Sequence, residues 1–419
     1  MSDDAFWASA LAAAVAEDAN DALAGARGRF RLPPGIIYLD GNSLGPAPEA
    51  ALAEIEQAAT REWARDLIGS WNSADWFALP TEYGDLLAPT IGAEPGEVVV
   101  CDTVSINIFK MLHAAFAMRP DRSVVVAEAG SFPTDLYVAE GAVATCPGAR
   151  LRLEGVDGPD ILDLIDADVA VVLVNQVDYR TGRLRDLAAV TAKAHAMGAL
   201  AIWDLCHSAG VVEVGLNAGR ADMAVGCTYK YLNGGPGSPA FVFAARRHHA
   251  EIRQPLSGWW GHARPFAFDR GYSPDPGIRK FLCGTQPILS FRAMRAGLAM
   301  FHDFPMAAIR AKSQALTDRF IALTGDTLGA YEVDLLSPRE ATARGSQVAL
   351  THAEAYAVTQ ALIHRGVVGD FRAPDVMRFG FAPLYLSHAD VVRAARTLHQ
   401  VLAGGCWDAP QYRARAAVT

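Results

Sequence analysis

Two side chains that could act together in catalysis, Asp204 and Lys230, stand at the ends of two apolar segments. Asp204 closes the run ALAIW at 199–203, and Lys230 follows the run ADMAVGC at 221–227. Short apolar runs are typical of buried strands, and strand ends in an open α/β sheet face the crevice where ligands bind. A lysine amine in a partly desolvated pocket can condense with an aldehyde, and a carboxylate keeps a bound pyridine nitrogen protonated. Pyridoxal phosphate requires these two protein groups.

Each of the two residues also has a plainer interpretation. A lone lysine at a strand end is more often a solvated surface residue. An aspartate in such a place often belongs to a turn or caps a helix. The spacing of Asp204 and Lys230 alone therefore leaves the function open, and the surrounding sequence has to decide it.

The segment WDLCHSAGVVEVGLNAGRADMAVGCTYKYLNGGPGSPAFVF at 203–243 resembles the cofactor segment of the kynureninase family. Generic enzymes of the pyridoxal-phosphate fold share the acid and the lysine, but not KYLNGGPG, GWWGH and FLCGTQP together. Further segments are similar to that family in the same order along most of the chain: IIYLDGNSLGP at 36–46, SFPTD at 131–135, SGWWGH at 257–262, FLCGTQPIL at 281–289 and RFGFAPLY at 378–385.

The resemblance implies a pyridoxal-phosphate enzyme of tryptophan breakdown or cofactor synthesis, with no metal, that hydrolyses L-kynurenine to anthranilate and L-alanine. It implies catalytic roles for Lys230, Tyr229 and Asp204. Arg378 would bind the substrate α-carboxylate by two parallel hydrogen bonds, and Trp71 would also line the substrate site. The implied cofactor-binding residues are Val104, Ser105, Phe132, Asp135, Asn175, Asp204, His207, Tyr229, Lys230, Trp259 and Thr285.

Trp259 and Thr285 imply a homodimer with composite active sites. In kynureninases these two residues reach the cofactor phosphate of the neighbouring subunit. From the local sequence alone, Trp259 is equally typical of a buried aromatic residue. Trp71, Gly284 and Thr285 are similar to the bacterial type, which favours kynurenine over 3-hydroxykynurenine.

The local sequence allows more than one role at several of these positions. The strand EVVVCDT at 97–103 precedes a helix that begins near Ser105, and a helix N-terminus binds anions such as phosphate. Ordinary capping by Asp102 or Ser105 would explain the same residues. Phe132 could stack on a flat conjugated ligand or belong to the core, and His207 could bond near the cofactor or be structural.

Apolar strands alternate with helices from residue 97 to residue 245. Repeated strand–helix–strand units predict an α/β fold, with a mainly parallel sheet covered by helices on both faces. A smaller α+β lobe follows, as in transferase-like pyridoxal-phosphate enzymes. We expect an N-terminal helical arm with part of the small domain at 1–60, the large cofactor domain at 61–300 and the small C-terminal domain at 301–419. Long helices are predicted over 3–26, 48–68 and 287–322.

The composition is that of an ordinary globular protein, with 51% hydrophobic and 20% charged residues among 419. Its length predicts two lobes, and its net charge of −9 argues against nucleic acid as the main partner. The six cysteines contain no CxxC pair, so reduced thiols in a cytoplasmic protein are the simplest interpretation. The start, MSDDAFW, lacks the basic region of a secretory signal, and no apolar run is long enough to cross a membrane.

Gly235, Gly237 and Ala240 fit the dinucleotide-binding fingerprint GxGxx[GA]. That fingerprint requires a helix after the glycines, whereas AFVFAA at 240–245 predicts a strand, so we reject it. Two competing functions stay compatible with Lys230 and Asp204. One is a different activity on the same fold, such as that of an aminotransferase or a cysteine desulfurase, although no cysteine here lies in a recognisable mobile loop. The second is a non-catalytic protein that retains both residues.

Overall fold

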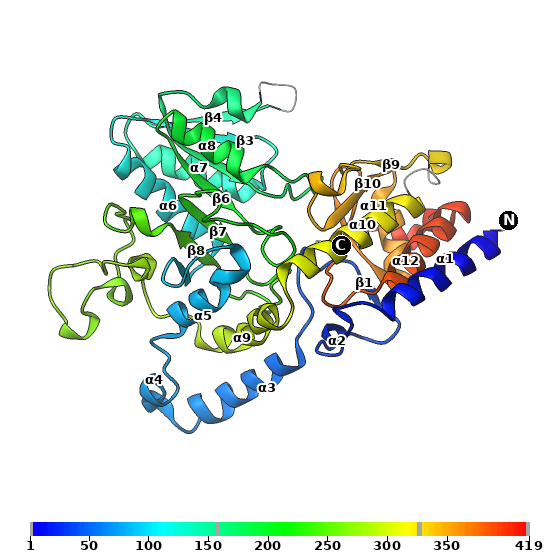
Figure 1. The fold of residues 1–419 in the computed structure, drawn as a ribbon, viewed down its shortest axis with the longest axis horizontal. Coiled ribbons are helices and arrows are strands. Elements are labelled where there is room, and N and C mark those ends of the chain that lie inside the picture. The colour runs from blue at the N-terminus through cyan, green and yellow to red at the C-terminus, as the bar shows by residue number, and fades with distance from the viewer. Residues whose placement is uncertain (1–2, 156–159, 325–328, 416–419) are drawn as a thin grey trace.

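The computed structural model describes residues 3–155, 160–324 and 329–415. Figure 1 shows two lobes side by side, with the N-terminus on the same side as the last helix. We call the part built on a seven-stranded sheet the large lobe and the part built on a four-stranded sheet the small lobe. No helix within the described ranges has the length and apolar character that crossing a membrane requires.

The sheet of the large lobe is mainly parallel, as predicted. Its order is β2-β8-β7-β6-β5-β3-β4, and only β8 runs antiparallel to both of its neighbours. Apolar runs of the sequence form six of its strands: β2 (Val98–Val100), β3 (Val124–Glu128), β5 (Val169–Asn175), β6 (Leu200–Asp204), β7 (Met223–Gly226) and β8 (Phe241–Ala244). The edge strand β4 (Arg150–Glu154) has the charged sequence RLRLE. The strand β8 follows the glycines at 235 and 237, so the helix that a dinucleotide site needs is replaced by a strand.

Helices cover both faces of this sheet. One buried cluster joins α6 (Val104–Met118) and α7 (Pro133–Thr145) to residues such as Val125 and Val171. The other cluster joins α5 (Leu79–Leu87) and α8 (Leu187–Ala196) to the alternate strand residues, such as Val126 and Val172. The fully apolar strands therefore bury both of their faces, as parallel strands do.

The small lobe contains an antiparallel sheet of order β12-β13-β10-β9. Its strands are β9 (Asp334–Leu335), β10 (Gln347–Thr351), β12 (Asp370–Arg372) and β13 (Val376–Gly380), and its helices are α10 (Met306–Thr324), α11 (Ala355–His364) and α12 (His388–Ala403). The N-terminal segment joins this lobe, because α1 (Asp3–Asp18) packs on α12 and β1 (Ile37–Tyr38) pairs with β11 (Val367–Val368).

The three long predicted helices are all shorter in the structure. The first ends at Asp18 and is followed by α2 (Ala24–Arg27), because Asp21 forms a turn by accepting from the Leu23 amide at 2.9 Å. The second, predicted over 48–68, consists of α3 (Glu49–Gln57) and a π-helical stretch (Ala58–Trp63) and ends in a 3-10 turn (Leu67–Gly69), after which α4 (Ser70–Ser73) follows. The third divides into α9 (Ile288–Asp303) and α10, because Pro305 disfavours a helical conformation at Phe304.

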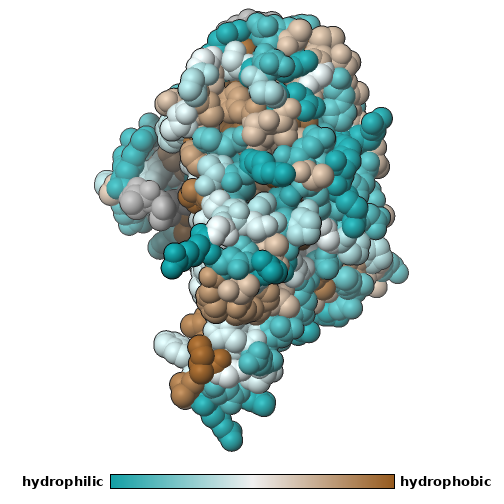
Figure 2. All heavy atoms as spheres, turned by 90° about the vertical axis from the view of Figure 1, so that its left-hand side faces the viewer, coloured by the Kyte–Doolittle hydropathy of each residue, from teal (hydrophilic) through white to brown (hydrophobic). Residues whose placement is uncertain are grey.

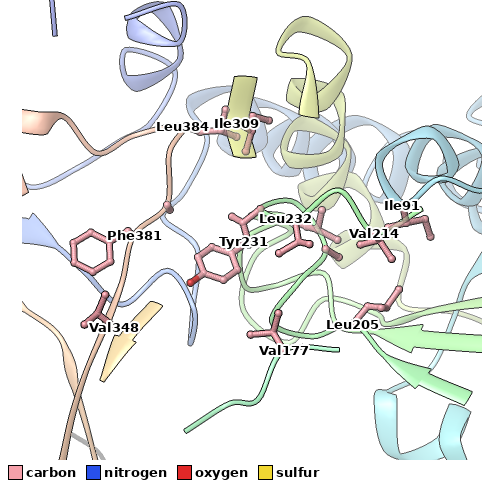
Figure 3. Packing of buried hydrophobic residues seen from close by; sticks show 14 of the residues in the cluster. Ile91, Val177, Leu205, Val214, Tyr231, Leu232, Ile309, Val348, Phe381 and Leu384 are labelled. Carbon is pink, nitrogen blue, oxygen red and sulfur yellow. The ribbon is translucent and has the colours of Figure 1, made fainter. Parts of the chain in front are cut away.

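The two lobes share a continuous apolar core at their junction. Figure 3 shows Tyr231 and Leu232 of the large lobe between Phe381 and Val348 on one side and Leu205 and Val214 on the other. The Tyr231 hydroxyl also donates to the Ser346 carbonyl at 3.0 Å. Because Tyr231 directly follows Lys230, this junction fixes the backbone that carries the candidate lysine.

Candidate active site

A cavity of about 400 Å³ opens where the carboxyl ends of β5, β6 and β7 meet the small lobe. Its lining comes from several segments that lie far apart in the sequence. Ten of the predicted site residues line it: Val104, Ser105, Phe132, Asp135, Asn175, Asp204, His207, Tyr229, Lys230 and Arg378. The prediction that strand ends bring the acid and the lysine into one crevice therefore agrees with the structure.

Lys230 is positioned by contacts to its side chain and by contacts to the adjoining backbone. Its Nζ lies 2.8 Å from His207 Nε2, and the other ring nitrogen of His207 lies 3.0 Å from Gln347 Oε1. On the backbone side, the amide of Gly45 donates to the Tyr229 carbonyl at 2.8 Å. A Cβ at residue 45 would lie only 2.5 Å from the Lys230 carbonyl oxygen, so this turn requires glycine.

Two carboxylates and an amide occupy the same wall of the cavity. Asn175 Nδ2 donates to Asp135 Oδ2 at 3.0 Å, and the Cys206 amide donates to Asp204 Oδ1 at 2.6 Å. Burial, followed by the negative charge of Asp204, raises the pKa of Asp135 well above its usual value. This wall would therefore bind a cationic ring N–H favourably.

The N-terminus of α6 reaches the cavity through Val104 and Ser105. The cap is Thr103, whose hydroxyl accepts from the Ile106 amide at 3.4 Å, so the alternative of capping by Asp102 or Ser105 is wrong. The first amides of a helix have no partner within it. Those of Val104 and Ser105 can therefore bind an anion in this cavity.

Arg378 enters the cavity from β13 with its guanidinium already engaged by Asp370 of β12. Its Nε donates to Asp370 Oδ1 at 2.8 Å, its Nη2 donates to Asp370 Oδ2, and its Nη1 donates to the Tyr179 carbonyl at 2.6 Å. Arg372 also lines the cavity and donates to Asp370 Oδ2 at 2.7 Å. One carboxylate thus serves two guanidinium groups, which leaves positive charge for a substrate anion.

Phe132 stands at the N-terminus of α7 and is 43% exposed. Its ring meets the Tyr179 ring edge to face, with centroids 5.3 Å apart. The Lys230 ammonium lies 5.9 Å from the Phe132 centroid. A flat ligand attached to that lysine would therefore lie within reach of the ring.

Three predicted site residues, Trp71, Trp259 and Thr285, lie outside the lining of this cavity. Thr285 is exposed, and Trp259 is 38% exposed. The Trp71 and Trp259 rings pack against each other with centroids 6.0 Å apart. The structure thus brings two of the three together on the surface of the large lobe, away from this chain's own Lys230.

Several residues that surround Arg378 were not predicted from the sequence. They lie in the small lobe and in the turn that contains Ser43. Asp370 and Arg372 belong to a strand of three residues, and no local signal marked it. Gln347 is the first residue of β10, and a single glutamine there carries no functional pattern. Ser43 belongs to the quoted motif IIYLDGNSLGP, and its hydroxyl donates to Asp370 Oδ2 at 2.7 Å. That motif was the one signal from which part of the arginine site could have been found.

Comparisons with known proteins agree with this site. Residues 309–398 match the family described as kynureninase C-terminal domain. The chain is 51% identical to a kynureninase of Burkholderia pseudomallei over 412 residues, which covers 97% of this chain and 99% of the relative. It is 51% identical to a kynureninase of Pseudomonas fluorescens over 411 residues, which covers 97% and 98%.

Solved structures with low sequence identity share the fold. A cysteine desulfurase of Thermococcus onnurineus superposes with a TM-score of 0.75 at 18% identity, covering 91% of this chain and 98% of the other. A variant of the enzyme C-DES with glycine covalently linked to its pyridoxal-phosphate cofactor superposes with a TM-score of 0.76 at 16% identity, covering 89% and 98%. At these identities the likeness concerns the fold alone.

The fold and the lysine–acid cavity define an enzyme of the pyridoxal-phosphate-dependent class. Within that class, the 51% identity to kynureninases over nearly the whole length shows the family. The chain belongs to the kynureninase family. A cysteine desulfurase activity is thereby set aside, because desulfurases resemble this chain only in fold.

Proposed function

We propose that the cavity between the lobes binds pyridoxal phosphate and hydrolyses L-kynurenine to anthranilate and L-alanine. The observation that carries the proposal is the meeting of Lys230 and Asp204 in one cavity of about 400 Å³, in a chain of the kynureninase family. Hydrolysis of 3-hydroxykynurenine to 3-hydroxyanthranilate by the same site is a second candidate reaction.

The cavity fits an anionic, aldehyde-bearing aromatic ring. Asp135 Oδ1 and Asn175 Oδ1 are buried and find no hydrogen-bond partner among the described residues, so the cavity wall retains acceptors for a ring N–H or hydroxyl. The amides at the start of α6 suit a phosphate, and Lys230 suits an aldehyde. These features support pyridoxal phosphate as the ligand.

Pyridoxal phosphate, when bound, supplies an aldehyde that captures the substrate amine and a ring that accepts the electrons released from the substrate. Lys230 would hold the aldehyde of the cofactor, and its amine would take the proton from the substrate Cα. Asp204 would hold the ring N–H, and the amides of Val104 and Ser105 would hold the phosphate. Phe132, Asp135, Asn175 and His207 complete the cofactor site.

The remaining groups bind and orient the substrate. Arg378 binds the α-carboxylate, and Asp370 fixes the plane of its guanidinium. The pKa of the Tyr229 hydroxyl is raised, first by the negative charge of a Cys227 thiolate and second by burial. The hydroxyl therefore keeps its proton at neutral pH and can donate it. Water then adds to the γ-carbonyl carbon and the Cβ–Cγ bond breaks, which releases anthranilate and leaves L-alanine.

The direct test mixes the purified protein with pyridoxal phosphate and L-kynurenine. Anthranilate is followed by its fluorescence and alanine by chromatography, and equal amounts of both products are expected. The variant Lys230→Ala should lose the covalent cofactor band and turnover. A protein that binds the cofactor but forms neither product would overturn the substrate, and Lys230→Ala with normal absorbance and turnover would overturn the lysine assignment.

We further propose a homodimer in which Trp259, Thr285 and Trp71 serve the site of the neighbouring subunit. The exposed aromatic surface around Trp259 supports it, because Phe266 is 63% and Phe268 83% exposed. Apolar side chains also gather on the projecting lower end of the face in Figure 2, the end that carries α4 in Figure 1. Exposed apolar patches of this kind mark interaction surfaces.

Subunit mixing tests this arrangement. Lys230→Ala and Trp259→Ala are each expected to be poorly active alone. In a mixed dimer, the subunit with Lys230 receives an intact Trp259 from its partner, so one of the two sites is complete. Activity should therefore rise after the two variants are unfolded and refolded together. No rise above the sum of the separate variants would show that Trp259 acts within its own chain, and light scattering would reveal a monomer directly.

We also propose a domain division with residues 1–60 and 301–419 around the small lobe and 61–300 around the large lobe. A cytoplasmic location is part of the same proposal. The six cysteines, all of which lie within the described residues, are free thiols, and this supports a reducing compartment. Limited proteolysis would test the boundaries, and cell fractionation would test the location.

A further inference from the structure

The His207 imidazole lies between a lysine of the large lobe and a glutamine of the small lobe. Lys230 Nζ lies 2.8 Å from its Nε2, and Gln347 Oε1 lies 3.0 Å from its Nδ1. Both His207 and Gln347 are buried. Gln347 is the first residue of β10, so the small lobe reaches the catalytic lysine through this histidine.

The orientation of the Gln347 amide is fixed by its other contacts. Its Nε2 donates to the carbonyl oxygens of Asp178 at 3.1 Å and of Tyr179 at 2.9 Å. Carbonyl oxygens only accept hydrogen bonds, so the amide nitrogen has to face them and Oε1 has to face His207. The Gln347 amide therefore presents an acceptor to the imidazole.

This acceptor determines the tautomer of His207. A neutral imidazole carries one N–H, and the nitrogen that faces an acceptor has to carry it. Nδ1 is thus the donor to Gln347, and Nε2 presents a lone pair to Lys230 Nζ. The opposite tautomer would place an N–H against the lysine ammonium, donor against donor.

The charged groups around His207 keep it neutral. Burial, followed by the positive charges of Lys230 and Arg378, holds its pKa well below the usual value. Arg372 acts in the same direction, whereas the hydrogen bond with Gln347 opposes it. A neutral ring with a fixed N–H is therefore the form that faces the lysine.

We propose that Gln347 is a positioning residue that fixes the His207 tautomer, so that Nε2 accepts a hydrogen bond from Lys230 and holds its free amine in place. The inference rests on the proposed function, in which Lys230 binds the cofactor aldehyde. It adds that the lysine is oriented only when the lobes are packed together, because Gln347 and its two carbonyl partners belong to different lobes.

The test measures how fast cofactor-free protein binds added pyridoxal phosphate between pH 6 and pH 9, followed by visible absorbance. Gln347→Leu removes the acceptor, and we expect capture on the order of ten-fold slower. Gln347→Glu keeps an acceptor towards His207 but loses the two donations to the Asp178 and Tyr179 carbonyls, and it adds a negative charge that favours charged His207. At high pH it should capture the cofactor faster than Gln347→Leu does, while the acid limb of its pH profile moves to higher pH.

Ser337→Ala is the matched control for a purely structural contact between the lobes. The Ser337 hydroxyl donates to the Thr181 carbonyl at 2.5 Å across the same junction and accepts from the Ala349 amide of β10 at 2.8 Å, but it does not touch His207. We expect its capture rate and pH profile to equal those of the natural protein. Equal slowing by Ser337→Ala and Gln347→Leu, or an unmoved acid limb in Gln347→Glu, would overturn the inference.

Failure of the proposed function would be visible before any variant is compared. The natural protein would then leave Lys230 unmodified after borohydride reduction with pyridoxal phosphate, as peptide mass spectrometry would show. If Gln347→Leu does not fold, the pH profile of Gln347→Glu still decides the matter, because it preserves the size of the side chain.

Discussion

Replacing Asp370 by asparagine tests whether one buried carboxylate holds the arginine site together. Asp370 is 1% exposed and lies at the centre of four donors. It accepts from Arg378 Nε at 2.8 Å and also from Arg378 Nη2. Arg372 Nη2 and Ser43 Oγ each donate to it at 2.7 Å. Asparagine keeps the shape but removes the charge and one of the two acceptor oxygens.

The expected loss follows from the bonds that asparagine cannot make. At least one charge-assisted hydrogen bond disappears, with a contribution of about 1.5–3 kcal/mol. The two guanidinium groups also lose the anion between them, and removing one partner of a buried ion pair costs about 3–5 kcal/mol. We therefore expect Asp370→Asn to lower the free energy of unfolding by about 3–5 kcal/mol at pH 7, and to raise KM for kynurenine through a misplaced Arg378.

Urea unfolding followed by circular dichroism measures this loss, with Asp168→Asn as the control. Asp168 pairs with Arg150 at 3.0 Å, but both side chains are exposed, so its replacement should cost no more than about 1 kcal/mol. Equal losses in the two variants would refute the reasoning from burial. So would an Asp370→Asn protein whose KM is unchanged, because Arg378 would then not depend on Asp370.

The pH dependence of the same difference gives a second check. Burial alone would raise the pKa of Asp370, but the charge and hydrogen bonds of Arg378 prevail and lower it. A lowered pKa stabilises the folded protein above the pKa of the unfolded carboxyl, about 3.9, and this contribution is lost as the pH falls further. The stability difference between the natural protein and Asp370→Asn should therefore shrink towards pH 3.

Three further predictions concern groups around the cavity. The buried ammonium group of Lys110 is paired with Asp102 beside the α6 N-terminus. Lys110→Met should therefore lower the free energy of unfolding by about 3 kcal/mol, measured by urea titration. An unchanged urea midpoint would contradict this. Burial and the charge of Asp370 raise the pKa of Asp40 to about 7, so stability should fall as the pH rises from about 4 to 7. Asp40→Asn should remove that fall and be the more stable protein in thermal melts at pH 8. Tyr229→Phe should lower kcat by about 10²-fold in anthranilate assays without slowing cofactor capture, and an unchanged kcat would leave the hydroxyl only a binding role.

The large-lobe half of the site could be predicted from the sequence because strand ends carry its residues. The runs before Asn175, Asp204 and Lys230 are apolar throughout, so they had to be strands buried on both faces. Parallel neighbours end at the same edge of a sheet, which places these side chains together. The geometry then follows from register, since Asn175 is the direct partner of Asp204.

The small-lobe half could not be predicted in the same way. Asp370 and Arg372 lie on a strand of three residues. The ion pair between Asp370 and Arg378 depends on the register of two antiparallel strands, which no sequence pattern fixes. The division of the predicted helix at 287–322 could have been predicted from the sequence, because Pro305 disfavours a helical conformation at the residue before it. Trp259 was typical of a core residue by type alone, whereas its 38% exposure emerges only from the tertiary arrangement.

The contacts that pack the two lobes together are also those that orient Lys230. The backbone on either side of Lys230 is held from outside its own strand, by the Gly45 amide on the Tyr229 carbonyl and by the Tyr231 hydroxyl on the Ser346 carbonyl. Ser346 directly precedes Gln347, whose amide acts on the lysine side chain through the histidine. The start of β10 thus reaches both the backbone and the amine of one residue. A substitution that shifts this strand would therefore act on the lysine even though it touches neither cofactor nor substrate.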